Sequence, residues 1–399
     1  IMGTKQYDSA TDLITFSRAS SATFLGSNGL LQTAANNIPR IEYDATGAVK
    51  GLLIEEARTN LVTYSNDFTN SSWTKYRVSI ASNVSGVTAP DGSETVDKMI
   101  PNSSNNEHRV WDGVSSTAVG ETYSVYAKSA GYDYVWLGYY EGSVYGYAVV
   151  NLTNGVVTAS NAANYSVEAS TNGFYRISVT KTASGTNPRY ISISPSPTAS
   201  PTLNSSNVPL YTGDGTSGIY VYGAQLEAGS FPTSYIPTTG AAATRARDLA
   251  QIPTSAFGYN NDQGSLVIDV LTPVVDQFMS LAYFNTSSFY DSRGFFKSGT
   301  GFNATGSYYA FQTHDGATTT LTLTQQTQAE YAKLGLSYGN NEKAVRDGGN
   351  VQSGTSRYPN PTRLHLGSRD SVYQSQCWIK SIQYYPRRLT DTQLQELTT

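Results

Sequence analysis

The sequence predicts an all-β protein with two tandem antiparallel β-sandwiches of the jelly-roll kind, preceded by a short β-rich N-terminal leader. The first observation is composition: 30 Tyr, 35 Gly and 15 Pro favour strands and turns over helices. The second is a series of short alternating segments bounded by turn residues, as at 121–130 and 264–274. The third is length, since 399 residues favour two or three domains over one.

The leader, residues 1–60, contains short apolar segments separated by turn sequences. SNG at 27–29 and DATG at 44–47 are the clearest turns. The leader has no periodicity that makes it a domain by itself. We therefore expect it to pack on a neighbouring domain or on another subunit.

The first sandwich is predicted over residues 61–248. In 121–130 the side chains of Tyr123, Val125 and Ala127 alternate with others and should share one face. The segments 132–140 and 144–159 read as further strands, with Asn154-Gly155 as a hairpin tip. Repeated short strands at this spacing are typical of a sandwich.

The stretch from Gly223 to Asp248 is predicted to join the two sandwiches. Tyr220, Tyr222 and Leu226 suggest an incoming strand with one buried face. Gly and Pro residues then break the regular pattern before Arg245 and Asp248 restore charge. Such a change of pattern is typical of a domain junction, and we place a hinge near position 240.

The second sandwich is predicted over residues 249–399. Leu266, Ile268 and Val270 should share the buried face of one strand. Near the C-terminus a strand should end at Pro386, and Thr390-Asp391 should open a short helix that buries leucines at 394 and 397.

Several of these stretches resemble known families. GAQLEAGSFPTSYIPTTGAAATRARD resembles the closing signature of a carbohydrate-binding-module-like jelly roll of bacteriophage tail-fibre and head-fibre proteins, and FSRASSATFLGSNGLLQTAANNIPRIEYD and GLLIEEARTNL resemble its leader. LGLSYGNNEKAVRDGG and WIKSIQYYPRRLTDTQLQELTT resemble a concanavalin-A-like (laminin-G-like) lectin domain. Together the resemblances cover most of the chain.

Bulk properties narrow the possible functions. The net charge of -4 gives no basic field for nucleic acid. No apolar run approaches the roughly 20 residues needed to span a bilayer, and the first residues do not read as a signal peptide. Cys377 is the single cysteine and should be a buried core residue.

The search for catalytic residues is mostly negative. His108, His314 and His365 are far apart and form no zinc-binding pattern. One alternative stays open, because Gln312-Thr313-His314, close to tyrosines 308 and 309, is similar to the Gln-x-His of alginate-lyase-like jelly rolls. Glu55 and Glu56 are adjacent, so in a strand they would point to opposite faces and not form a glycosidase pair. We therefore expect no enzyme activity.

Aromatic side chains are the candidate ligand-binding groups, since sugars pack C–H patches on flat rings. In the first sandwich the candidates are Trp136, Tyr139, Tyr140, Glu141, Tyr145 and Tyr147, although alternation favours Trp136 as core. In the second sandwich a loop-end site could include Tyr290, Asp291, Arg293, Arg369 and Asp370. Calcium is conceivable at Asp276, Asp291 or Asp370, but no dense acidic loop supports it, so no cofactor is predicted.

The resemblance and the many aromatic side chains together suggest a non-enzymatic phage fibre or spike component that binds host-surface polysaccharide. The alternatives are a polysaccharide lyase or glycoside hydrolase, and a purely structural virion adaptor. The resemblance further implies a location in the virion after assembly in the host cytoplasm, contacts with other phage structural proteins, and a homo-oligomer, with a trimer favoured.

Overall fold

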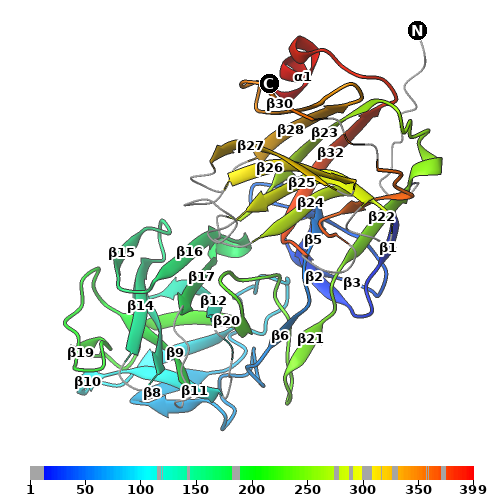
Figure 1. The fold of residues 1–399 in the computed structure, drawn as a ribbon. Helices are drawn as coiled ribbons and strands as arrows, with labels where there is room; N and C mark the ends of the chain where they lie inside the picture. Colours follow the sequence, from blue (N-terminus) through cyan, green and yellow to red (C-terminus); the bar gives the residue numbers. More distant parts are fainter. Residues whose placement is uncertain are drawn as a thin grey trace.

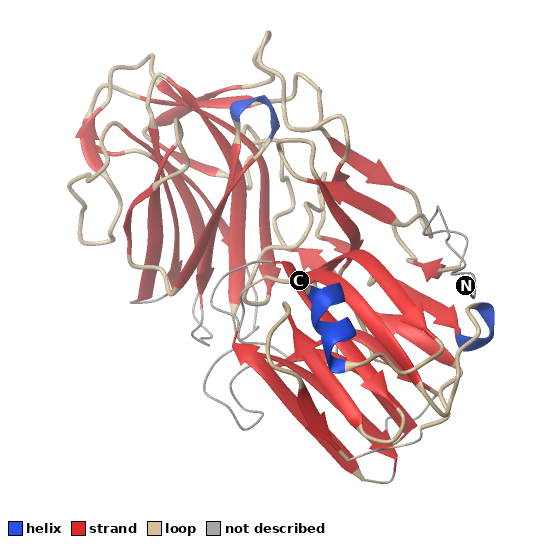
Figure 2. Ribbon diagram, turned by 90° about the horizontal axis from the view of Figure 1, so that it is seen from above, coloured by secondary structure: helices blue, strands red, loops and turns tan. Residues whose placement is uncertain are grey.

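A computed structural model confirms the all-β class. Figures 1 and 2 show two β-sandwiches and little helix, and the pairings between the named strands are antiparallel. The structure describes residues 13–114, 118, 120–141, 144–181, 189–273, 278–286, 291–298, 308–315, 317–325, 331–355, 357, 359–369 and 374–399.

The first sandwich consists of two six-stranded sheets. Sheet I has the order β15 (Val157–Ser160), β14 (Val144–Asn151), β13 (Tyr134–Glu141), β18 (Arg189–Ser196), β11 (Arg109–Val114), β7 (Thr74–Tyr76). Sheet II has the order β16 (Asn164–Ala169), β17 (Tyr175–Lys181), β12 (Glu121–Ala130), β20 (Gly218–Ala228), β9 (Asp97–Pro101), β8 (Val78–Ala81). A two-stranded ribbon of β10 (Asn105–Glu107) and β19 (Leu210–Thr212) lies beside them.

The core between these sheets follows the predicted alternation in β12. Tyr123, Val125 and Ala127 all pack in it, as expected. The predicted strand is present as β20, but its predicted single buried face was wrong: Leu226 lies in this core, whereas Tyr222 belongs to a separate cluster on the other side of the sheet. The cause is a β-bulge opposite β12 at Gly223, whose φ of 63° suits glycine, because one extra residue reverses the inward and outward positions.

The second sandwich consists of two seven-stranded sheets. Sheet III has the order β1 (Thr15–Ser17), β22 (Leu249–Pro253), β31 (Arg363–Leu366), β24 (Met279–Asn285), β25 (Asp291–Ser298), β26 (Tyr308–Asp315), β27 (Thr318–Gln325). Sheet IV has the order β30 (Gln352–Gly354), β29 (Glu342–Arg346), β28 (Tyr331–Tyr338), β23 (Gly264–Leu271), β32 (Cys377–Tyr385), β5 (Val49–Ile54), β4 (Arg40–Tyr43). The predicted face of Leu266, Ile268 and Val270 lies in the core, and Cys377 is fully buried there.

The leader is part of the second sandwich. Its strand β1 pairs with β22, and β5 pairs with the late strand β32 through Cys377 and Ile54. Figure 1 shows the dark blue leader strands among the green-to-red strands of that sandwich. Sheet pairing therefore divides the chain differently from the predicted ranges 1–60, 61–248 and 249–399.

The first sandwich is inserted between the two parts of the second. The chain leaves through β6 (Arg58–Asn60) and returns through β21 (Ala243–Arg245), and these two strands pair as a neck. A hairpin of β2 (Ala22–Leu25) and β3 (Leu31–Ala34) lies beside the neck. The predicted C-terminal helix is α1 (Asp391–Thr398), with a capping box between Thr390 and Gln393 and a buried Leu394.

Candidate functional site

The outer face of sheet I carries a continuous group of aromatic side chains. In β13 the odd-numbered Val135 and Leu137 enter the core, so the even-numbered side chains point outward. Strand register then aligns Tyr145, Tyr140 and Tyr190 as direct neighbours on β14, β13 and β18. Trp111 lies on the next strand, β11. We call Trp111, Tyr140, Tyr145 and Tyr190 the aromatic face; all four are half-buried.

These rings contact one another. The Tyr140 ring lies 4.6 Å from that of Tyr145 and is stacked on that of Tyr190 at 5.8 Å with an interplanar angle of 12°. Trp111 meets Tyr190 edge to face at 4.7 Å. A hydrogen bond with Tyr145 raises the pKa of the Tyr140 hydroxyl. The contacts hold the rings in place before any ligand arrives, which reduces the ordering cost of binding.

Small residues lie beside the rings of the aromatic face. Gly113 is the register partner of Tyr190, and Gly138 and Ser192 occupy the row between Tyr147 and Trp111. Gly138 and Ser192 are buried, and the Trp136 ring fills the space above Gly138. Gly113 is exposed beside the rings of Tyr190 and Trp111, where a sugar ring could stack.

Trp136 and Tyr147 lie on the same side of sheet I; Trp136 is covered, whereas Tyr147 is half-buried. Their rings stack at 5.9 Å, and Val208 and Leu203 from the Ser/Pro-rich loop after β18 pack on Trp136. Trp136 is only 3% exposed. Trp136 is therefore buried, as the alternative expected, but it lies under this loop and not between the two sheets, and its burial does not support its predicted role in ligand binding.

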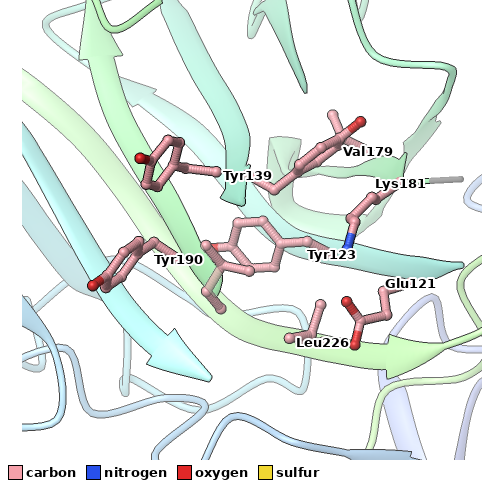
Figure 3. Close-up of a pocket in the computed structure, with 9 residues that line it drawn as sticks. Glu121, Tyr123, Tyr139, Val179, Lys181, Tyr190 and Leu226 are labelled. Carbon is pink, nitrogen blue, oxygen red and sulfur yellow. The ribbon is translucent and has the colours of Figure 1, made fainter. Parts of the chain in front are cut away.

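Tyr139 points to the opposite side of the sheet from Tyr140. It lines a cavity of about 20 Å³ at the end of the sandwich, which is bordered by residues of both sheets. Figure 3 shows Tyr139 and Tyr190 on one side of this pocket and Lys181 and Glu121 on the other, with Tyr123 between them. Burial raises the pKa of the Tyr123 hydroxyl well above its usual value, and the nearby Asp112 adds to the effect.

The predicted site residue Glu141 is the last residue of β13, and its side chain lies outside the part of the chain that the structure describes.

Most of the predicted loop-end site of the second sandwich was misplaced or lies outside the described residues. Arg293 is fully buried inside the sandwich, where its guanidinium lies 3.6 Å from Glu342 and 3.7 Å from the centre of the Tyr338 ring. Burial raises the pKa of Glu342 to about 7, although Arg293 opposes the shift. The prediction of an accessible Arg293 was wrong, because strand alternation turns it inward. Tyr290, Asp370, Asp276 and the Asp291 side chain lie outside the described residues.

Arg369 is half-buried and lies over the rings of Phe278 and Tyr283, on the outer face of sheet III. Tyr283 donates a hydrogen bond of 3.2 Å to Gln312 on the same face. His314 shares this face with Gln312, and His365 is the register partner of Tyr283. Gln312 therefore has a tyrosine as its partner, whereas His365 lies three strands from β26; Tyr283, His314 and His365 are all buried.

No group of three or more potential metal ligands occurs within the ranges that the structure covers. The three histidines lie in different strands or connections. Across the same ranges, no helix has both the length and the hydropathy of a membrane span.

The signature stretch forms a buried ionic cluster at the junction between the sandwiches. Asp248 binds Arg18 at 3.1 Å and Arg40 at 2.6 Å, and Arg40 also binds Glu55 at 2.8 Å. Arg245 pairs with the same Glu55. These five residues form the junction cluster. Burial alone would raise the pKa of Glu55, but Arg245, Arg40 and hydrogen bonds from Ser234 lower it to about 2.

The junction cluster contains Glu55 but not its neighbour Glu56. Glu55 is fully buried in the cluster, whereas Glu56 binds Arg58 on the neck. Both lie in the connection between β5 and β6, so the predicted strand alternation does not apply to them. The charged residues of the signature, Arg245 and Asp248, join the leader to the chain that returns from the first sandwich.

Sequence reasoning missed Trp111 and Tyr190 as members of the aromatic face. Both occur in short strands with few aromatic neighbours along the chain. An alternation count in β18, where Ile191 and Ile193 are core, would have turned Tyr190 outward. The pairing of β18 between β13 and β11, which brings the rings together, is not visible locally.

No family model matches the sequence, and no curated protein matches it. Among solved structures, the chain is similar to the CBM40 of a Ruminococcus gnavus IT-sialidase bound to alpha2,3 sialyllactose (14% identity, 36% of this chain and 87% of that chain, TM-score 0.30). It is also similar to the CBM22-1-CBM22-2 tandem domain of Paenibacillus barcinonensis Xyn10C (9% identity, 83% of this chain and 98% of that chain, TM-score 0.27). A third similar structure is Trypanosoma rangeli sialidase (10% identity, 94% of this chain and 69% of that chain, TM-score 0.29). At such low TM-scores these matches carry no argument about the ligand or activity of this chain.

Proposed function

We propose that this protein binds glycans without cleaving them, through the aromatic face of sheet I. The observation that carries the proposal is the row of Tyr145, Tyr140 and Tyr190 on three adjacent strands, extended by Trp111. Flat rings beside small residues suit the C–H faces of sugars.

The test is alanine substitution of Tyr140 and Tyr190 with binding measured on a glycan array and by calorimetry. We expect each substitution to weaken binding about tenfold, which corresponds to about 1.4 kcal/mol. Tyr165→Ala is the matched control, because Tyr165 is 50% exposed on the opposite sheet and belongs to no ring cluster of sheet I.

Loss of binding in the Tyr165 variant, or unchanged binding in both aromatic-face variants, would contradict the proposal. If the array shows no binding at all, even when the protein is applied as an assembled oligomer, the result would favour the purely structural adaptor.

The sequence resemblance supports a finer proposal. In this proposal the chain is a fibre or spike component of a virion, assembled in the host cytoplasm as a trimer with other phage structural proteins, and its ligand is a host-surface polysaccharide. Repeated weak sites in a trimer would raise avidity. Light scattering of the purified chain tests the trimer, and blocking of phage adsorption by the purified chain tests the role.

A second candidate function is a polysaccharide lyase on the outer face of sheet III. It is favoured by the hydrogen bond between Tyr283 and Gln312, with His314 two residues further along the same strand. Incubation with uronate-rich polysaccharides should then produce unsaturated products, detected by their ultraviolet absorbance, and His314→Ala should abolish them. Absence of such products would leave the non-enzymatic proposal.

A further inference from the structure

The small pocket behind the aromatic face has an open and a closed side. Its lining includes half-buried Tyr139, Tyr140 and Tyr190, whereas Tyr123 and Lys181 are buried. Tyr140 and Tyr190 also belong to the aromatic face, so the pocket lies at the edge of that face. A group projecting from a sugar stacked on Tyr140 could therefore enter between the half-buried tyrosines.

The buried side of the pocket holds a polar atom that needs a partner. Tyr123 is 1% exposed, and its hydroxyl has no hydrogen-bond partner within the described part of the chain. A buried hydroxyl left without a partner destabilises the protein, so a pocket lined by such a residue is suited to a hydrogen-bonding guest. Hydroxyl groups can both donate to and accept from the tyrosine.

The volume and charge of the pocket restrict that guest. A cavity needs about 10–15 Å³ to hold one water molecule, and this cavity measures about 20 Å³. The space suits the end of a hydroxymethyl arm but not a bulky acetamido group. Lys181 and Glu121 offer one charge of each sign at its wall, and Asp112 lies near Tyr123, so an additional carboxylate would meet excess negative charge.

We propose that this pocket is a subsite for the exocyclic hydroxymethyl group of a neutral hexose, with Tyr123 as its hydrogen-bond partner. The inference rests on the proposed glycan binding and adds a specificity to it: hexopyranoses bind in preference to the pentopyranoses that lack this arm.

The experiment compares sugars that differ only in the hydroxymethyl group. Calorimetry would use cellohexaose against xylohexaose, and methyl β-galactopyranoside against methyl α-L-arabinopyranoside. We expect the preferred hexose to bind about tenfold more tightly than its pentose partner, as one well-placed hydrogen bond allows. Tyr123→Phe should remove this preference by weakening hexose binding and leaving pentose binding unchanged.

Two further variants make the test specific. Val179→Ile adds a methyl group at the pocket wall and should also reduce the preference, which keeps the test valid if Tyr123→Phe does not fold. Tyr309→Phe removes a buried hydroxyl in the second sandwich and should leave the preference intact. Thermal unfolding of each variant confirms that it is folded.

The outcomes separate this subsite from the proposed function. Equal affinities within both pairs, with binding still lost in Tyr140→Ala, would overturn the subsite alone. Equal weakening of hexose and pentose by Tyr123→Phe would also overturn it. Absence of binding to every sugar, including the array, would overturn glycan binding and the subsite with it.

Discussion

Tyr139 and Tyr140 are adjacent in the sequence but have different roles, because successive side chains in a strand point to opposite faces of the sheet. Tyr139 packs toward the inter-sheet pocket, and Tyr140 joins the aromatic face. Glu55 and Glu56 are also adjacent, in the connection between β5 and β6, and Glu55 is buried in the junction cluster whereas Glu56 pairs with Arg58. At the scale of one residue, burial and partners decide whether a tyrosine or a carboxylate is a binding group or a structural one.

Glu55 gives a pH-dependent prediction. Its pKa in the folded protein is about 2, below the ordinary value of 4.5, so its contribution to stability is present above pH 4.5 and is lost as the pH falls toward 2. Glu55→Gln should lower the free energy of unfolding at pH 7 by about 3–5 kcal/mol, because buried arginines lose their partner. Denaturant unfolding across this pH range measures the difference.

The difference between Glu55→Gln and the unmodified protein should shrink between pH 4.5 and 2. Glu94→Gln, at an exposed position, is the control and should have no effect. A difference that stays constant with pH would show that the charge of Glu55 is not the source of the stability.

At the scale of elements, the leader strand β5 fits closely against β32. Gly51 in β5 has a φ of 126°, and a Cβ atom there would lie 2.5 Å from the carbonyl oxygen of Ile379. Glycine is needed both for the backbone angle and for the close approach. The strand pairing of β5 therefore depends on one residue without a side chain.

Gly51→Ala should destabilise the second sandwich by about 2 kcal/mol or more, since both strain and backbone contact oppose the new methyl group. Gly47→Ala is a matched control: Gly47 also has a positive φ, 85°, but nothing lies within 4 Å of its Cβ position. Thermal unfolding of both variants separates the effect of the close contact with Ile379 from the effect of backbone strain at a positive φ. Equal losses in the two variants would show that the close approach at β5 contributes nothing.

At the scale of the whole molecule, the first sandwich is an insertion in the second. The chain enters and leaves through the paired strands β6 and β21, and the junction cluster joins residues from the leader with residues after the insertion. The first sandwich has its own core, whereas the second lacks Leu52 and Ile54 without the leader.

This arrangement predicts how fragments behave. Residues 61–242 should fold alone, because their core is complete and their two ends adjoin the paired neck strands β6 and β21. Residues 249–399 should not, because the leader strands β4, β5 and β1 are missing from both sheets. Circular dichroism and cooperative thermal unfolding of the two fragments would decide this. A cooperative unfolding transition of the fragment 249–399 would contradict this expectation and support the independent C-terminal domain that the sequence predicted.

The amino-acid sequence by itself determined the β class, the strand over 121–130, the buried face of Leu266, Ile268 and Val270, and the C-terminal helix. These features depend on local alternation and capping, which a short window contains. Only the tertiary structure decided the rest. The pairing of Ile54 with Cys377, the bulge at Gly223 and the meeting of Tyr140 with Tyr190 join residues far apart in the chain or reverse a face by one residue. Such choices depend on which strands lie side by side, and local sequence does not encode them.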